Sequence, residues 1–205
     1  MSKSRKPIVV VSGLPRSGTS MMMRMLDQGG LAPVTDGIRE SDEDNPRGYY
    51  EVELVKGLKK QQDKSWLGAA EGKAIKIVSS LLKDLPPDYC YDVIFMNRSL
   101  DEVIASQNKM IVRRGETSGS ADQQMRQLYE QHLRSIRSWL AKQGNFRLLE
   151  VGYNQAMQDP AGQAERVKNF LGLPLNAVKM SEAVDEQLYR NRSGDAGTAG
   201  RGSRN

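Results

Sequence analysis

The chain has 205 residues and a formal net charge of +5. This length suits one hydrophobic core without a disulfide or metal to stabilise it. The single cysteine and single histidine exclude an internal disulfide, a cysteine-rich zinc site and a pair of histidine ligands. No apolar run approaches the roughly 18 residues that a membrane span needs, and the first residues show no secretory leader. We therefore expect a cytoplasmic protein with no membrane partner.

The positive charge is concentrated at the ends of the chain. Three basic side chains lie in residues 1–7, whereas residues 8–192 are nearly neutral. Since nucleic-acid binding needs a basic folded part, we expect no nucleic-acid partner. Residues 193–205 contain four glycines and no large apolar side chain, which predicts disorder. The sequence thus predicts a basic extension (1–7), one domain (8–192) and a disordered tail (193–205).

Strand-like and helix-like segments alternate along the chain. Short β-branched apolar runs are typical of buried parallel strands, and apolar residues at helical spacing predict helices. In chain order the predicted elements are strand 8–12, helix 19–28, helix 50–63, strand 74–78, helical turn 79–85, strand 91–96, helix 99–111, helix 122–143, strand 146–151, helix 160–171 and helix 176–190. This alternation predicts an α/β fold with a parallel sheet between two layers of helices.

The clearest motif joins the first predicted strand to the first predicted helix. Residues 13–20 read GLPRSGTS, and at such a junction backbone N–H groups and a helix N-terminus form an anion site. The spacing matches the phosphate-binding pattern G-x-x-x-x-G-K-[ST], except that Thr19 replaces the lysine. We therefore expect a three-layer sheet of the P-loop type. The candidate phosphate ligands are Pro15, Arg16, Ser17, Gly18, Thr19 and Ser20.

The departure at Thr19 weighs against a nucleoside triphosphatase. Such an enzyme uses the lysine on the terminal phosphates and an acidic residue at a strand end to hold magnesium. The second and third predicted strands end in Val78-Ser79 and Asn97-Arg98, so neither supplies a carboxylate and no metal is expected. A P-loop nucleotide kinase or hydrolase, a non-catalytic nucleotide-binding protein and a glycine-rich turn without a ligand remain as alternatives.

The segment LPRSGTS after a strand resembles the loop with which sulfotransferases hold the 5′-phosphosulfate of 3′-phosphoadenosine 5′-phosphosulfate. The resemblance covers most of residues 8–192, and the segment NPRGYYE at 45–51 looks like one found in small bacterial members. It implies an enzyme that transfers a sulfuryl group to a hydroxyl or amine of a small-molecule or peptide acceptor. The other product would be adenosine 3′,5′-bisphosphate, and no metal would take part.

The resemblance also assigns cofactor-binding residues outside the loop. Arg98 and Ser106 look like the family's pair for the 3′-phosphate, and Tyr153 looks like the tyrosine that contacts adenine in many members. Arg98 also follows a predicted strand, where open α/β sheets bind ligands, and Ser106 lies about two turns into the next helix. Many members close over the cofactor with basic residues, which would be Arg190 and Arg192 here, although two solvated arginines at a helix end are an equal explanation.

The catalytic groups are less clearly marked. Arg16 offers a cation inside the loop, and Lys76 lies where some members carry an active-site lysine, although a charge at a strand edge is an equal explanation. The single histidine, His132, falls within a long predicted helix and reads as a surface residue, so it is not assigned. A carboxylate is the natural substitute as a base. The candidates, in no fixed order, are Asp36, Glu40 and Glu51.

Overall fold

The computed structural model describes residues 5–37, 50–113 and 122–184. Within these residues, four parallel strands form one sheet in the order β2-β1-β3-β4. The strands are β1 (Ile8–Gly13), β2 (Ala74–Lys76), β3 (Tyr91–Asn97) and β4 (Phe146–Gly152). Gly13 pairs with Met96, and Asn97 pairs with Gly152, so the strands end at the same edge of the sheet.

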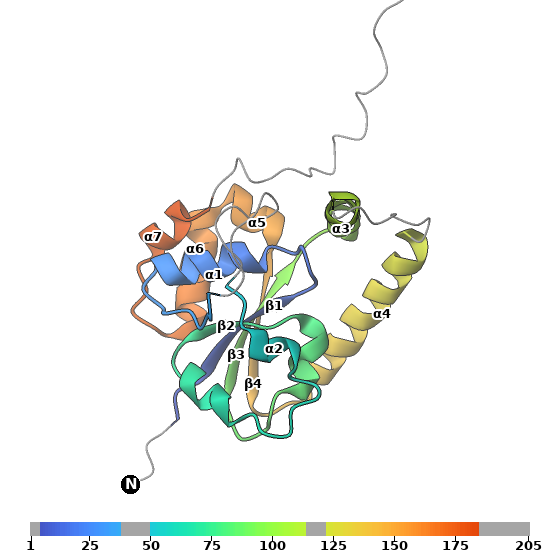
Figure 1. The fold of residues 1–205 in the computed structure, drawn as a ribbon. Helices are drawn as coiled ribbons and strands as arrows, with labels where there is room; N and C mark the ends of the chain where they lie inside the picture. The colour runs from blue at the N-terminus through green and yellow to red at the C-terminus, as the bar shows by residue number, and fades with distance from the viewer. Residues whose placement is uncertain (1–4, 38–49, 114–121, 185–205) are drawn as a thin grey trace, which may run out of the picture.

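Helices cover both faces of this sheet (Figure 1). The α-helices are α1 (Thr19–Gln28), α2 (Glu53–Lys56), α3 (Leu100–Arg113), α4 (Asp122–Leu140), α5 (Tyr153–Gln158), α6 (Pro160–Leu171) and α7 (Ala177–Glu182), and two 3₁₀ segments are η1 (Ser65–Ala70) and η2 (Ser79–Asp84).

Successive residues of β1 point to opposite faces, because the side chains of a strand alternate. Val9 and Val11 pack in a core with α1, α5, α6 and α7, whereas Ile8 and Val10 pack in a second core with η1, η2 and α4. The three-layer α/β prediction is therefore confirmed. No helix in the described part of the chain is both long and apolar enough to cross a membrane.

The element boundaries differ from the predicted ones mainly after the first helix. The helix predicted over 50–63 is only the four-residue α2. It stops at Gly57, and the side chain of Gln61 donates to the Leu54 carbonyl, which satisfies an acceptor that a longer helix would use. Helix α5 was not predicted, and α7 is shorter than expected. Residues 1–4 of the predicted extension and the predicted tail 193–205 lie outside the described residues.

Candidate functional site

Two glycines shape the turn between β1 and α1. Gly13 has a φ of 150° and Gly18 a φ of 98°, values at which residues with a side chain are strained. A Cβ atom at Gly13 would collide with Ser17 Oγ and approach Met96 O within 2.7 Å. A Cβ atom at Gly18 would collide with the ring of Tyr153. The turn therefore needs glycine at both positions.

The turn presents unsatisfied polar groups beside a helix N-terminus. The first N–H groups of α1 have no partner within the helix, and Gly18 at the N-cap has no side chain to accept from them. The hydroxyl groups of Ser12 and Ser17 are buried and have no hydrogen-bond partner among the described residues. Since the N-terminus of a ten-residue helix is electropositive, this turn has the donors of an anion site.

Arg16 connects this turn to α3. Its φ of 68° places a residue with a long side chain in the left-handed region. Its Nε donates to Ser106 Oγ over 2.9 Å, and Ser106 is buried. The structure thus joins two predicted cofactor residues that lie 90 positions apart.

Arg98 directly follows β3, and only 8% of its side chain is exposed. Its Nε donates to Glu102 Oε2 over 2.8 Å, and its Nη1 donates to the carbonyl of Arg16 over 3.2 Å. Its guanidinium also lies 4.3 Å from the centre of the Tyr153 ring. Because Glu102 is 2% exposed, the pair compensates two buried charges and holds Arg98 against the turn.

Tyr153 is the first residue of α5 and is buried against Gly18 and Arg98. Burial is the main cause that raises the pKa of its phenol, and the carboxylate of Glu102 adds to the rise. Sequence reasoning did not assign Glu102 to the site. Its spacing of four residues from Arg98, at the start of a predicted helix, favours an ion pair and was the signal that could have marked it.

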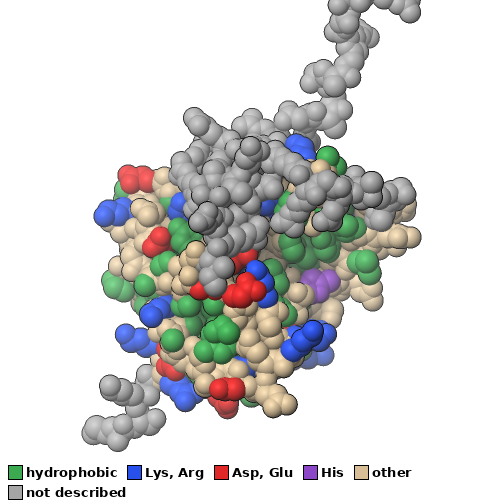
Figure 2. All heavy atoms as spheres, viewed as in Figure 1, with side chains coloured by type: hydrophobic (Ala, Val, Ile, Leu, Met, Phe, Trp, Pro, Cys, Tyr) green, Lys and Arg blue, Asp and Glu red, His purple; other side chains and the backbone are tan. Residues whose placement is uncertain are grey.

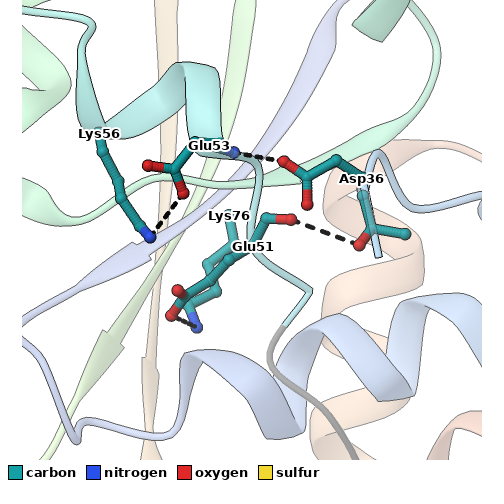
Figure 3. A network of polar contacts seen from close by, with 6 residues as sticks. Asp36, Glu51, Glu53, Lys56 and Lys76 are labelled. Atoms are coloured by element: carbon teal, nitrogen blue, oxygen red, sulfur yellow. Dashed lines mark hydrogen bonds and ion pairs between the residues drawn. The ribbon is translucent and has the colours of Figure 1, made fainter. Parts of the chain in front are cut away.

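Lys76 and Glu51 form an ion pair beside the first turn of α1 (Figure 3). Lys76 Nζ lies 3.2 Å from Glu51 Oε1 and 3.3 Å from Ser20 Oγ. The Lys76 side chain is 10% exposed and that of Glu51 is 22% exposed. The structure therefore brings two predicted catalytic residues together with one predicted phosphate ligand.

Asp36 lies near Glu51 but binds the backbone of α2. Its Oδ2 accepts from the N–H of Glu53 over 2.5 Å, at the first residue of α2, as Figure 3 shows. The third predicted base, Glu40, lies outside the described residues, as do Arg190 and Arg192. Pro15 is exposed at the tip of the turn, and Thr19 is buried at the start of α1.

His132 is half-buried and forms a hydrogen bond to another element. From the sequence it was taken for a surface residue, and this contact was not predicted. Its Nε2 lies 2.8 Å from Oγ of the buried Ser79, 53 positions away. The imidazole reaches the surface in the view of Figure 2, where it is the purple side chain. Burial, and then the positive charge of Lys83, lower the pKa of His132. No local pattern marks such a long-range pair.

Comparisons with known proteins give a consistent result. Residues 81–177, which include Arg98, Ser106 and Tyr153, match the model of the sulfotransferase family. No curated protein matches the sequence.

Several solved structures share the fold. The sulfotransferase domain of the olefin synthase from Synechococcus PCC 7002 matches with a TM-score of 0.54 at 15% identity, and the match covers 93% of this chain and 85% of that domain. The sulfotransferase STF1 from Mycobacterium tuberculosis matches with a TM-score of 0.57 at 17% identity, over 88% of this chain and 71% of STF1. The mouse sulfotransferase SULT7A1, complexed with PAP, matches with a TM-score of 0.50 at 15% identity, over 88% of this chain and 63% of SULT7A1.

Proposed function

We propose that the chain is a sulfotransferase that transfers a sulfuryl group from 3′-phosphoadenosine 5′-phosphosulfate to a hydroxyl or amine of a small-molecule or peptide acceptor. The match of residues 81–177 to the model of the sulfotransferase family supports this proposal. The contact between Arg16 and Ser106 carries this proposal. It joins the anion-binding turn to the Arg98–Ser106 pair, so two sites for phosphate groups lie next to each other. A nucleotide with phosphate groups at both ends suits that arrangement, whereas a nucleoside triphosphate has only one such end.

The turn would hold the 5′-phosphosulfate of the donor. The N–H groups at the start of α1 point along the helix axis toward an anion, and Ser17, Thr19 and Ser20 add hydroxyl donors. Gly13 and Gly18 permit the backbone conformation of this turn, since a side chain at either position collides with its surroundings. Arg16 adds a positive charge on the same turn.

Arg98 and Ser106 would bind the 3′-phosphate. An arginine fork matches phosphate oxygens well, and Glu102 keeps this fork oriented at the end of β3. Tyr153 would lie against the adenine. In this proposal Arg190 and Arg192 add positive charge at the same end of the nucleotide.

Lys76 and Glu51 are suited to the transfer step. The S–O bond to the 5′-phosphate breaks while the acceptor oxygen or nitrogen bonds to sulfur, so negative charge grows on the leaving phosphate. As in phosphoryl transfer, positioning and charge stabilisation dominate such a step. Lys76, which contacts Ser20, and Arg16 would stabilise that charge.

Glu51 would take the proton of the acceptor. Its carboxylate contacts Lys76 and thus lies beside the groups that face the donor. The Asp36 carboxylate instead binds the backbone of α2, which makes it the weaker candidate, and Glu40 remains a candidate outside the described residues. A carboxylate in hydrogen-bond reach of the acceptor performs the role of a general base.

Calorimetric titration of the protein with adenosine 3′,5′-bisphosphate and with ATP, each with and without magnesium, tests the donor. We expect the bisphosphate to bind without magnesium, and Arg98→Ala to weaken it at least tenfold, while Arg134→Ala on the exposed face of α4 leaves it unchanged. Binding of ATP with magnesium, and none of the bisphosphate, would instead support a nucleotide kinase or hydrolase. Transfer of labelled sulfate to a panel of hydroxyl and amine acceptors then tests catalysis.

A further inference from the structure

Tyr50 has a strained backbone next to a proposed catalytic residue. Its φ is 50°, and among the described residues only Arg16 shares a positive φ without being glycine. The left-handed region is unfavourable for a bulky side chain, and strain of this kind persists only where surrounding contacts impose it. Here the strain lies directly before Glu51.

Two contacts of the Tyr50 side chain compensate this strain. The phenol donates to Asp27 Oδ2 over 3.2 Å, and the ring packs against the core that contains α1. Burial, and then the negative charge of Asp27, raise the pKa of Tyr50, so the phenol keeps the proton that it donates. Tyr50 is thereby attached to the last turn of α1.

The backbone at Glu51 has a second attachment on the opposite side. Its carbonyl accepts from Thr35 Oγ1 over 3.3 Å. Glu51 is thus held through its neighbour Tyr50 and through Thr35, in the segment that follows α1.

Together with α1, these contacts form a closed circuit. Asp27 lies near its end and Ser20 near its beginning. Between them run the contacts from Asp27 to Tyr50, from Glu51 to Lys76, and from Lys76 to Ser20. The position of the Glu51 carboxylate relative to the anion-binding turn therefore depends on the attachment of its neighbour to the same helix.

We propose that Tyr50 is a positioning residue: its hydrogen bond to Asp27 directs the Glu51 carboxylate toward Lys76 and the anion-binding turn. This inference rests on the proposed function, since Glu51 is its base. Without the bond, the backbone at Tyr50 relaxes toward a favourable conformation and the carboxylate moves. Donor binding does not change, because Arg16, Arg98 and Ser106 make none of these contacts and Ser20, which does, keeps its bond to Lys76.

Steady-state kinetics of Tyr50→Phe and Asp27→Ala test this proposal. Each is expected to lower kcat roughly tenfold and to leave the KM for the donor and the affinity for adenosine 3′,5′-bisphosphate unchanged, because a displaced catalytic group slows only the chemical step. Asp27→Asn keeps an oxygen that accepts from the phenol and is expected to restore most of kcat. The control Tyr91→Phe removes the bond from a phenol to the Pro86 carbonyl, at the opposite edge of the sheet, and is expected to keep kcat.

Equal losses of kcat in Asp27→Ala and Asp27→Asn, or an unchanged kcat in Tyr50→Phe, would overturn the proposal. If Tyr50→Phe does not fold, the two Asp27 variants still decide between the outcomes.

A double-mutant cycle tests the positioning role of Tyr50 without an enzyme assay. Tyr50 and Lys76 are connected through Glu51, so Tyr50→Phe and Lys76→Met are expected to change the unfolding equilibrium constant non-additively, by at least about threefold. Additive effects in urea unfolding contradict the positioning role. If the protein transfers no sulfate but the cycle shows coupling, the proposed function fails while the structural arrangement stands.

Discussion

Arg16 Nε lies 2.9 Å from Ser106 Oγ, and this hydrogen bond links the turn after β1 to helix α3. In the proposed complex, both groups contact the donor nucleotide. Ser106→Ala is expected to raise the dissociation constant of adenosine 3′,5′-bisphosphate about tenfold, since a hydrogen bond to a charged group contributes roughly 1.5–3 kcal/mol. Calorimetric titration measures this change. Ser138→Ala, on the exposed side of α4, is the control, and equal affinities of the two variants would remove Ser106 from the site.

Arg98 stabilises the fold as well as the proposed phosphate site. Arg98→Met leaves the Glu102 carboxylate buried without its cation, so we expect a loss of about 3 kcal/mol in the free energy of unfolding. Adding Glu102→Gln removes that charge and is expected to recover at least half of the loss. Urea unfolding measures both values.

Bisphosphate binding separates the two roles of Arg98. The double variant Arg98→Met/Glu102→Gln is expected to recover stability but not affinity. If affinity returns together with stability, Arg98 acts only through the fold.

Substitutions of Glu51 and Asp36 are expected to affect kcat differently. Glu51→Gln is expected to lower kcat about 100-fold, a typical loss for a general base, and to leave bisphosphate affinity unchanged. Asp36→Asn keeps an oxygen at the N-terminus of α2, so we expect kcat within about threefold of the original enzyme. Glu53→Gln, whose carboxylate is exposed and pairs with Lys56, is the matched control. The reverse ranking in steady-state assays would assign the base to Asp36.

His132 makes stability depend on pH. Because burial and Lys83 lower its pKa in the folded state, the unfolded chain takes up a proton first as the pH falls. The folded state is therefore expected to lose stability as the pH falls through 6.5, the pKa of an unperturbed histidine, and to keep it fully at higher pH. Urea unfolding at pH 7.5 and 5.5 measures this loss, and His132→Asn should reduce it. An equal loss in the variant would refute the assignment.

The local part of the architecture was predictable from the sequence. Helix α1 begins at Thr19 and ends at Gln28 as predicted, because its apolar spacing and the glycines on both sides are local signals. Helix α6 is likewise as predicted, with Pro160 in its first turn and Gly172 at its end. The predicted length of the helix at α2 was wrong. The apolar spacing after Glu53 continues past Gly57, but the chain turns at Gly57.

The long-range contacts of the site were not predictable in the same way. The motif marked Arg16, and the resemblance marked Ser106, but only the fold shows that they touch. Two further contacts, Tyr50 with Asp27 and Ser79 with His132, join residues that are far apart in the sequence. No local sequence motif marks either pair. Such contacts depend on how helices pack across the sheet.

The strand order predicts unequal rigidity for the two sides of the candidate site. The turn and Arg98 follow β1 and β3, which pair with a strand on both sides, whereas Lys76 ends the three-residue β2, whose outer side has only an isolated bridge from Ala74 to Pro33. Edge elements open more readily in hydrogen exchange than central ones. In the proposed enzyme the donor would therefore meet a rigid frame, and substitutions around β2 would adapt the chain to new acceptors without disturbing the nucleotide.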